Sequence, residues 1–234
     1  MRLGRPGLLS LAFLVLSPTV AAPAEAAECP AELSTVTKVI VVTAERTDGF
    51  KATIDTYARA SPAEKFKREL ARARAVIGRN GWAWGHGWPV PDGERKKVEG
   101  DGRSPAGLFK MGRPFGFAGQ QRPGYLLLEN GKTFCVDDVR SEAYGRIVPR
   151  QSLPRGTTGE DMRTIPLYEH GFVIDYPSDR DARSGSCVFV HLWRTPGQGT
   201  AGCVAADRGT VLKLQEWAND ETARIGRASC RERV

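Results

Sequence analysis

The sequence lacks several features that mark common functional classes. Beyond the N-terminal segment, it contains no apolar run long enough to cross a membrane. None of its glycine-rich stretches has the G-x-x-x-x-G-K-[ST] pattern of a phosphate-binding P-loop. It has neither an internal repeat nor a low-complexity linker. These absences argue against a membrane-spanning chain, P-loop chemistry and a repeat array, and they indicate one folded domain.

An excess of charge of one sign is also nearly missing. The chain has 34 Lys and Arg against 27 Asp and Glu, but five of the arginines and two of the glutamates lie in its two ends. Without these ends the counts are 29 and 25, an excess of four positive charges. So small an excess fits weak attraction to an anionic cell wall and gives little support to nucleic acid as a partner. We expect no nucleic-acid partner, and the sequence leaves the oligomeric state open.

Clusters of metal-ligand residues are scarce. Asp137 and Asp138 are adjacent carboxylates, but no histidine lies near them in the sequence. Capping of a turn explains such a pair better than metal binding does. We therefore expect neither a metal nor a cofactor.

The N-terminus is typical of a secretory signal peptide. Arg2 and Arg5 precede a short, mostly apolar run at residues 8–16, and small residues follow at 21–27. We expect cleavage after Ala26, and therefore an exported, soluble protein of the periplasm or cell wall. Glu28 before Cys29 argues against a lipid anchor.

The C-terminal residues of the chain are not expected to belong to the natural protein. Residues 225–234 resemble what a common sequencing-adapter DNA gives when translated, so we interpret them as an assembly artefact. The expected organisation is a signal peptide at 1–26, one domain at 27–224 and the artefact at 225–234.

The pattern of residues within this domain predicts mostly strands. Residues 38–45, 171–176 and 187–193 are rich in β-branched or aromatic residues. Asn130-Gly131 predicts a β-hairpin over residues 125–136. Asp207 is placed to cap a helix that reaches Trp217. The stretch 66–77 has helical spacing but also alternates as a strand does.

The candidate chemistry lies between residues 185 and 205. Alternation in the strand 187–193 puts Cys187, Phe189, His191 and Trp193 on one face. Cys187 and His191 would lie about 13 Å apart at ~3.3 Å per residue, which is too far for a catalytic pair. The Pro/Gly-rich loop after Trp193 instead returns the chain to Cys203. A thiol beside a histidine can act as a nucleophile, and the pairing lowers the thiol pKa.

The residues around Cys203 are small. Ala201 and Gly202 leave room for a substrate carbonyl, and the backbone N–H groups of residues 202–204 could stabilise an oxyanion. We therefore name Cys203, His191 and Gly202 as catalytic residues. The residues expected to contact substrate are Trp193, Thr200, Ala201 and Val204.

Together these stretches resemble the L,D-transpeptidase (YkuD) family. Residues 185–191 followed by 200–204 resemble its catalytic signature, and residues 78–85, 97–109 and 135–138 also match. The resemblance implies a mostly β domain, of sandwich or barrel type, with one or two peripheral helices. It further implies that Cys203 attacks peptidoglycan stem peptides at the meso-diaminopimelate–D-alanine bond, with His191 as base and then acid.

Three departures from the family pattern concern substrate recognition. Ala201 stands where many members have histidine, Ala205 stands where many have arginine or asparagine, and the loop between His191 and Cys203 is short. Hydrolysis, as carboxypeptidase or endopeptidase, is therefore an alternative to transpeptidation. A catalytically silent wall-binding module is a third hypothesis. The resemblance also favours strand over helix at residues 66–77.

The remaining cysteines allow more than one pairing. Setting Cys230 aside, four cysteines can form three complete sets of disulfides, and the sequence does not choose among them. If Cys203 stays a thiol, at most one bridge forms. We expect it between Cys135 and Cys187, which leaves Cys29 and Cys203 free.

Overall fold

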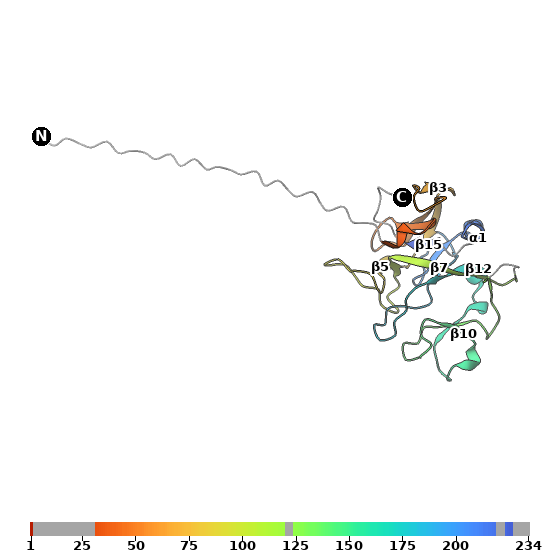
Figure 1. The fold of residues 1–234 in the computed structure, drawn as a ribbon. Coiled ribbons are helices and arrows are strands. Elements are labelled where there is room, and N and C mark those ends of the chain that lie inside the picture. Colours follow the sequence, from red (N-terminus) through yellow and green to blue (C-terminus); the bar gives the residue numbers. More distant parts are fainter. Residues whose placement is uncertain (2–30, 120–123, 219–222, 227–234) are drawn as a thin grey trace.

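The computed structural model describes Met1 and residues 31–119, 124–218 and 223–226 (Figure 1). The predicted signal peptide, Cys29 and most of the predicted artefact fall outside these residues. The strands are β1 Lys38–Ala44, β2 Lys51–Ala58, β3 Lys67–Arg68, β4 Ala73–Val76, β5 Trp82–Trp84, β6 Ser104–Ala106, β7 Leu108–Gly116, β8 Leu126–Leu127, β9 Phe134–Val136, β10 Ile147–Val148, β11 Gly159–Asp161, β12 His170–Asp175, β13 Phe189–Leu192, β14 Val204–Ala206 and β15 Ala223–Gly226. The helices are α1 Arg208–Trp217 and the 3-10 turns η1 Ala31–Ser34, η2 Arg150–Ser152, η3 Met162–Thr164 and η4 Pro166–Tyr168.

Most of the strands form one closed barrel. They pair in the order β1-β15-β7-β12-β13-β14-β4-β2, and the ring closes because β1 pairs with β2 as well as with β15. Two short strands extend the sheet, β3 beside β2 and β8 beside β7. Closure removes the unpaired edges that an open sheet would expose. The prediction of a mostly β domain is confirmed.

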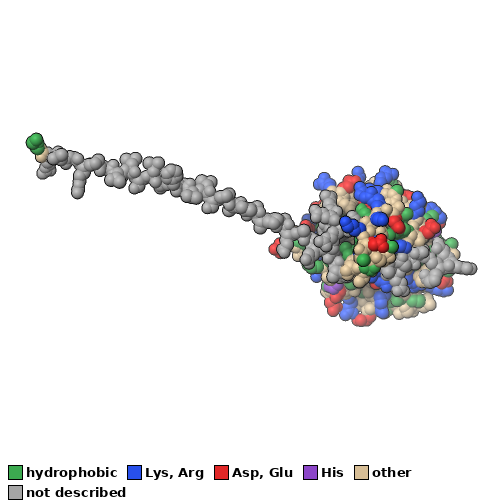
Figure 2. All heavy atoms as spheres, turned by 45° about the horizontal axis from the view of Figure 1, so that its top comes forward, with side chains coloured by type: hydrophobic (Ala, Val, Ile, Leu, Met, Phe, Trp, Pro, Cys, Tyr) green, Lys and Arg blue, Asp and Glu red, His purple; other side chains and the backbone are tan. Residues whose placement is uncertain are grey.

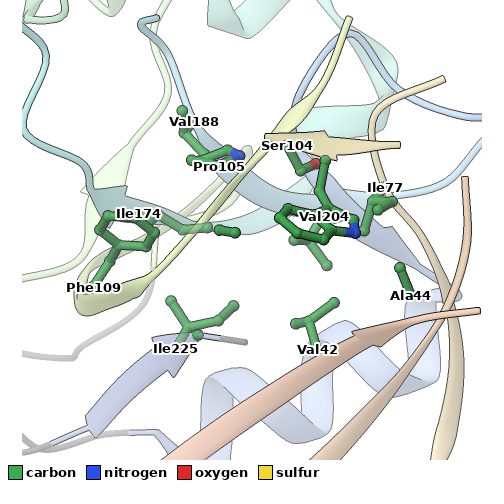
Figure 3. Close-up of a pocket in the computed structure, with 13 residues that line it drawn as sticks. Val42, Ala44, Ile77, Ser104, Pro105, Phe109, Ile174, Val188, Val204 and Ile225 are labelled. Carbon is green, nitrogen blue, oxygen red and sulfur yellow. The ribbon is translucent and has the colours of Figure 1, made fainter. Parts of the chain in front are cut away.

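The interior of the barrel is apolar. Val42, Ile174 and Val204, from three different strands, point into one small space (Figure 3). Ile40 and Phe172 are completely buried nearby. Burial of apolar side chains at roughly 25 cal/mol per Å² is the main force that holds such a ring together.

A second, smaller sheet lies below the barrel strands β7 and β12 in Figure 1, where it carries the label β10. Its three short strands pair in the order β10-β9-β11. A disulfide from Cys135 on β9 to Cys187 ties it to the segment that enters β13. The predicted bridge is therefore confirmed.

The predicted C-terminal helix is α1. Asp207 caps it through a hydrogen bond of 3.0 Å accepted from the Thr210 N–H. It is the one α-helix among the described residues, so the lower of the two predicted helix numbers is correct. None of the described helices is long and apolar enough to cross a membrane.

The stretch 66–77 forms strands, as the family resemblance favours. The helical spacing of this stretch predicts a helix, which is wrong because the edge of β2 that does not pair with β1 pairs with both β3 and β4. Asp55 on β2, which is 3% exposed, also binds the guanidinium groups of Arg68 and Arg72. These ion pairs hold the two short strands against β2.

The predicted hairpin over residues 125–136 is wrong, although its turn at Gly131 exists (φ 69°). The two flanking strands, β8 and β9, do not pair with each other. Leu126 and Leu127 extend the barrel beside β7, whereas Phe134–Val136 is the central strand of the small sheet. A turn signal predicts a reversal of the chain but not the partner of the strand that follows.

The barrel extends past the predicted domain boundary at residue 224. Ile225 and Gly226 belong to β15, which lies between β1 and β7. Ile225 is 3% exposed and faces the apolar interior (Figure 3).

The outer surface carries both signs of charge. Figure 2 shows Lys, Arg, Asp and Glu side chains scattered over the visible face.

Candidate active site

Two parallel strands bring His191 and Cys203 together. β13 and β14 pair so that Val190 lies opposite Val204 and His191 lies opposite Ala205. Side chains alternate along a strand, so Cys203, two residues before Ala205, is on the same face as His191. Both side chains line one cleft of about 320 Å³. The barrel register thus produces the pair that the sequence predicts.

Most of the other predicted site residues also reach this cleft. The predicted residues that line it besides the pair are Trp193, Thr200, Ala201 and Gly202. Val204 is different, because its side chain points into the barrel interior (Figure 3). The structure therefore does not bring the Val204 side chain to the other predicted substrate contacts.

Cys187 lines the cleft, but it lies before the strand β13 and not on it. β13 begins at Phe189, and Cys187 has a φ of 51°, which no strand residue has. The predicted strand 187–193 is therefore too long at its start. Because its sulfur is in the disulfide, Cys187 is not a nucleophile. Its carbonyl oxygen accepts a hydrogen bond from the Cys203 thiol at 3.4 Å.

The contacts of His191 define which of its nitrogens is free. Its Nδ1 lies 2.7 Å from the carbonyl oxygen of Leu192. A carbonyl only accepts, so Nδ1 carries the proton and Nε2 keeps a lone pair available to a base. Burial lowers the pKa of His191 to about 4, which keeps the ring neutral near neutral pH.

Burial has the opposite effect on the thiol. It raises the pKa of Cys203 to about 12, and the carboxylate of Glu160 adds to the shift. The Phe189 N–H and the Lys97 ammonium oppose it but are weaker. The sequence-based prediction of a lowered thiol pKa is thus wrong, because desolvation of the buried thiol outweighs the neighbouring donors. The pair rests as neutral thiol and neutral imidazole.

The turn before Cys203 is held by two hydroxyl groups. Thr200 Oγ1 donates to the Cys203 carbonyl at 2.6 Å, and the buried Ser104 Oγ lies 3.1 Å from the same oxygen. Thr200 Oγ1 also accepts from the Gly202 N–H at 3.1 Å. The Gly202 N–H is therefore used within the turn and is not free as predicted. Within the described part of the chain, no hydrogen bond from the Cys203 N–H is seen, so this donor stays available to a bound ligand.

Among the other residues that line the cleft, Glu160, Tyr168 and Lys97 were not selected from the sequence. Glu160 and Tyr168 form a hydrogen bond of 2.7 Å, and Lys97 donates to Asp101 at 2.7 Å. Lys97 lies in one of the stretches that resemble the family, but its burial depends on the whole fold and cannot be read from the local sequence. Nothing in the local sequence around Tyr168 marks it as a neighbour of His191.

The acidic pair Asp137 and Asp138 is engaged in local structure. Asp137 accepts from the Thr158 hydroxyl at 2.6 Å, and Asp138 binds the Arg140 guanidinium at 2.9 Å. Among the described residues, no group of three or more His, Cys, Asp and Glu side chains is arranged to hold a metal ion.

Comparison with known proteins gives distant structural neighbours. No family model and no curated protein matches the sequence. The helical cell shape determining protein Pgp2 from Campylobacter jejuni is similar over 85% of this chain, with 14% identity and a TM-score of 0.42. Bd1075 from Bdellovibrio bacteriovorus is similar over 83%, also with 14% identity and a TM-score of 0.42. This chain spans about half of each, 51% and 49%. At these values nothing about the activity of this chain follows from either structure.

Proposed function

We propose that the protein is an exported cysteine L,D-transpeptidase that acts on peptidoglycan stem peptides in the periplasm or cell wall. The observation that carries this proposal is the meeting of Cys203 and His191 on one face of the parallel pair β13 and β14. The matching sequence stretches around both residues supply the substrate class. A free thiol beside a histidine with an available nitrogen is the arrangement that acyl transfer through cysteine needs.

The first half of the reaction forms a thioester. His191 Nε2 takes the thiol proton as Cys203 Sγ attacks the carbonyl carbon of the stem peptide, and the carbonyl oxygen becomes an oxyanion near the Cys203 N–H. The carbon–nitrogen bond then breaks. The proton passes from the imidazolium to the leaving amine, which departs as D-alanine. Because burial raises the pKa of Cys203 and lowers that of His191, we expect proton transfer to accompany attack.

The second half releases the acyl group. An amine of another stem peptide attacks the thioester, His191 takes its proton, and the sulfur leaves and regains a proton. The products are a cross-linked peptide and the free thiol.

Hydrolysis is a second candidate outcome, and one observation favours it. Ala205 is completely buried, opposite His191 on one side and Val76 on the other. It cannot contact a substrate as the arginine or asparagine that many family members have at this position could. With one contact fewer to a peptide substrate, water becomes a competing acceptor, and the protein would act as a carboxypeptidase or endopeptidase.

Mass spectrometry of products tests these alternatives. The mature chain is incubated with tetrapeptide stem fragments from a diaminopimelate-type wall. Cross-linked dimers with released D-alanine would support transpeptidation, and shortened peptides alone would support hydrolysis. Bound but unchanged peptide would overturn both and leave a wall-binding module.

A matched pair of variants controls this experiment. Cys203→Ala should abolish both products, with a loss of about a thousandfold or more. Thr195→Ala lies in the same loop but does not line the cleft, so it should retain activity. Full activity in Cys203→Ala would show that the site is elsewhere.

A further inference from the structure

The orientation of the His191 ring is set by more than its own hydrogen bond. The Leu192 carbonyl contacts only Nδ1, so this hydrogen bond does not fix the tilt of the ring plane. Neighbouring side chains must restrain the tilt. The ring of Tyr168 meets the His191 ring edge to face, with 5.1 Å between ring centres and 65° between the planes. Tyr168 also lines the catalytic cleft. It is thus the aromatic side chain placed to decide where Nε2 points.

Tyr168 itself is fixed at both ends. Its ring packs edge to face against Phe189 at 5.4 Å and Phe115 at 5.9 Å, and its side chain is almost fully buried. Its hydroxyl donates to Glu160 Oε2 at 2.7 Å. Packing restrains the tilt of the ring, and the hydroxyl bond restrains its position along the cleft.

Glu160 links this contact to the small sheet. It lies on β11, directly opposite Cys135 of β9. Cys135 is bonded to Cys187, whose carbonyl oxygen accepts the Cys203 thiol. The cross-strand pair Glu160–Cys135 is therefore connected to both reacting groups. Glu160 contacts Tyr168, which contacts His191. Cys135 is bonded to Cys187, which contacts Cys203.

Burying the Glu160 carboxylate beside Tyr168 has a cost in free energy that an apolar side chain would not have. Glu160 is a largely buried carboxylate, and burial raises its pKa. A buried carboxylate destabilises the fold unless a partner compensates it. Here the partner is the Tyr168 hydroxyl, so the two side chains are held together as a hydrogen-bonded pair.

We propose that Tyr168 is a positioning residue for His191 and that Glu160 holds Tyr168 in place. The inference rests on the proposed function for its meaning in catalysis, but its test does not require substrate. Tyr168 acts through His191 and not on the reacting bond.

The test measures alkylation of Cys203 by iodoacetamide in the full mature chain, followed by peptide mapping so that only this thiol is scored. His191→Ala should lower the alkylation rate near neutral pH by about tenfold, because base assistance is lost. Tyr168→Leu should lower it by a similar factor. In the double variant the rate should equal that of His191→Ala alone.

Conservative variants separate positioning from packing. Tyr168→Phe keeps the ring but loses the hydroxyl bond, and we expect a loss of about threefold. Glu160→Ala should match it, whereas Glu160→Gln retains an acceptor and should restore the rate. Phe109→Leu removes a ring from the barrel aromatic cluster, away from the cleft. It should lower the melting temperature and leave alkylation unchanged.

Two results would overturn the positioning role. One is an effect of Tyr168→Leu that persists undiminished in the His191→Ala background. The other is a slower alkylation in Phe109→Leu that tracks its loss of stability. If instead the coupling holds but stem peptides are left unchanged, the positioning role stands and the proposed function fails.

Discussion

The barrel and the small three-stranded sheet are stabilised by different interactions. The barrel closes eight strands around a large apolar interior that includes Ile40 and Phe172, both fully buried. The small sheet has strands of two or three residues and a cluster of only a few buried apolar side chains. A disulfide and the hydrogen bond between Glu160 and Tyr168 tie it to neighbouring segments, and Cys135 also packs in a buried cluster with Phe115 and Phe189 of the barrel.

This difference corresponds to two tasks at the site. Barrel register places the backbone of His191 and of Cys203 on adjacent strands. In the proposed mechanism, the small sheet holds the groups that orient their side chains, since Tyr168 contacts the imidazole and the Cys187 carbonyl accepts the thiol. A lesion in the barrel should therefore reduce stability with little effect on chemistry, and a lesion in the small sheet should reduce both.

The largest effect on stability is expected from loss of the disulfide. Cys135 and Cys187 are 52 residues apart, so replacing both by alanine should cost about 4 kcal/mol of unfolding free energy. Turnover should also fall, by about tenfold, because the Cys187 carbonyl is released. Urea unfolding and steady-state kinetics measure the two effects. Unchanged turnover at a temperature where the variant is folded would contradict the role given to the small sheet.

A somewhat smaller effect is expected from the buried imidazole. The pKa of His191 is about 4 in the fold and 6.5 as the ordinary value, so between these pH values the unfolded chain binds more protons than the folded one. Stability is therefore complete above pH 6.5 and is lost as the pH falls towards 4, by about 3 kcal/mol.

Urea titrations at a series of pH values isolate this contribution. His191→Gln lacks the titrating group, so the difference in stability between wild type and variant should shrink as the pH falls through this window. A difference that stays constant with pH would show that the His191 ring is not buried in its neutral form.

The smallest effect is expected at the barrel helix. Asp207→Ala removes the cap of α1 and should cost about 1 kcal/mol, while turnover stays unchanged. Asp207→Asn keeps an acceptor and should recover most of the loss. Thermal melting and kinetics check both statements. A marked fall in turnover in Asp207→Ala would contradict the claim that a lesion in the barrel reduces stability with little effect on chemistry.

Local sequence signals predicted much of the barrel. The β-branched run at β1, the Asp207 cap and the strand that carries His191 depend on neighbours in the chain, and the structure contains them. The partner of each strand depends on edges formed far away. This is why the turn at Gly131 was predictable while the pairing of β8 and β9 was not.

The candidate site divides in the same way. Cys203 and His191 belong to one contiguous motif, so the pair was visible in the sequence. Tyr168 and Glu160 reach the cleft only because the small sheet packs against the barrel. The raised thiol pKa was likewise hidden, since desolvation depends on the whole fold around Cys203.

The central claim, a thioester on Cys203, has one direct measurement. The protein is mixed with tetrapeptide stem fragments, quenched in acid and analysed by intact mass and peptide mapping. We predict an adduct of one tripeptide acyl group on the peptide that contains Cys203, sensitive to hydroxylamine and absent in Cys203→Ala. An adduct on another residue, or D-alanine release by Cys203→Ala, would contradict it.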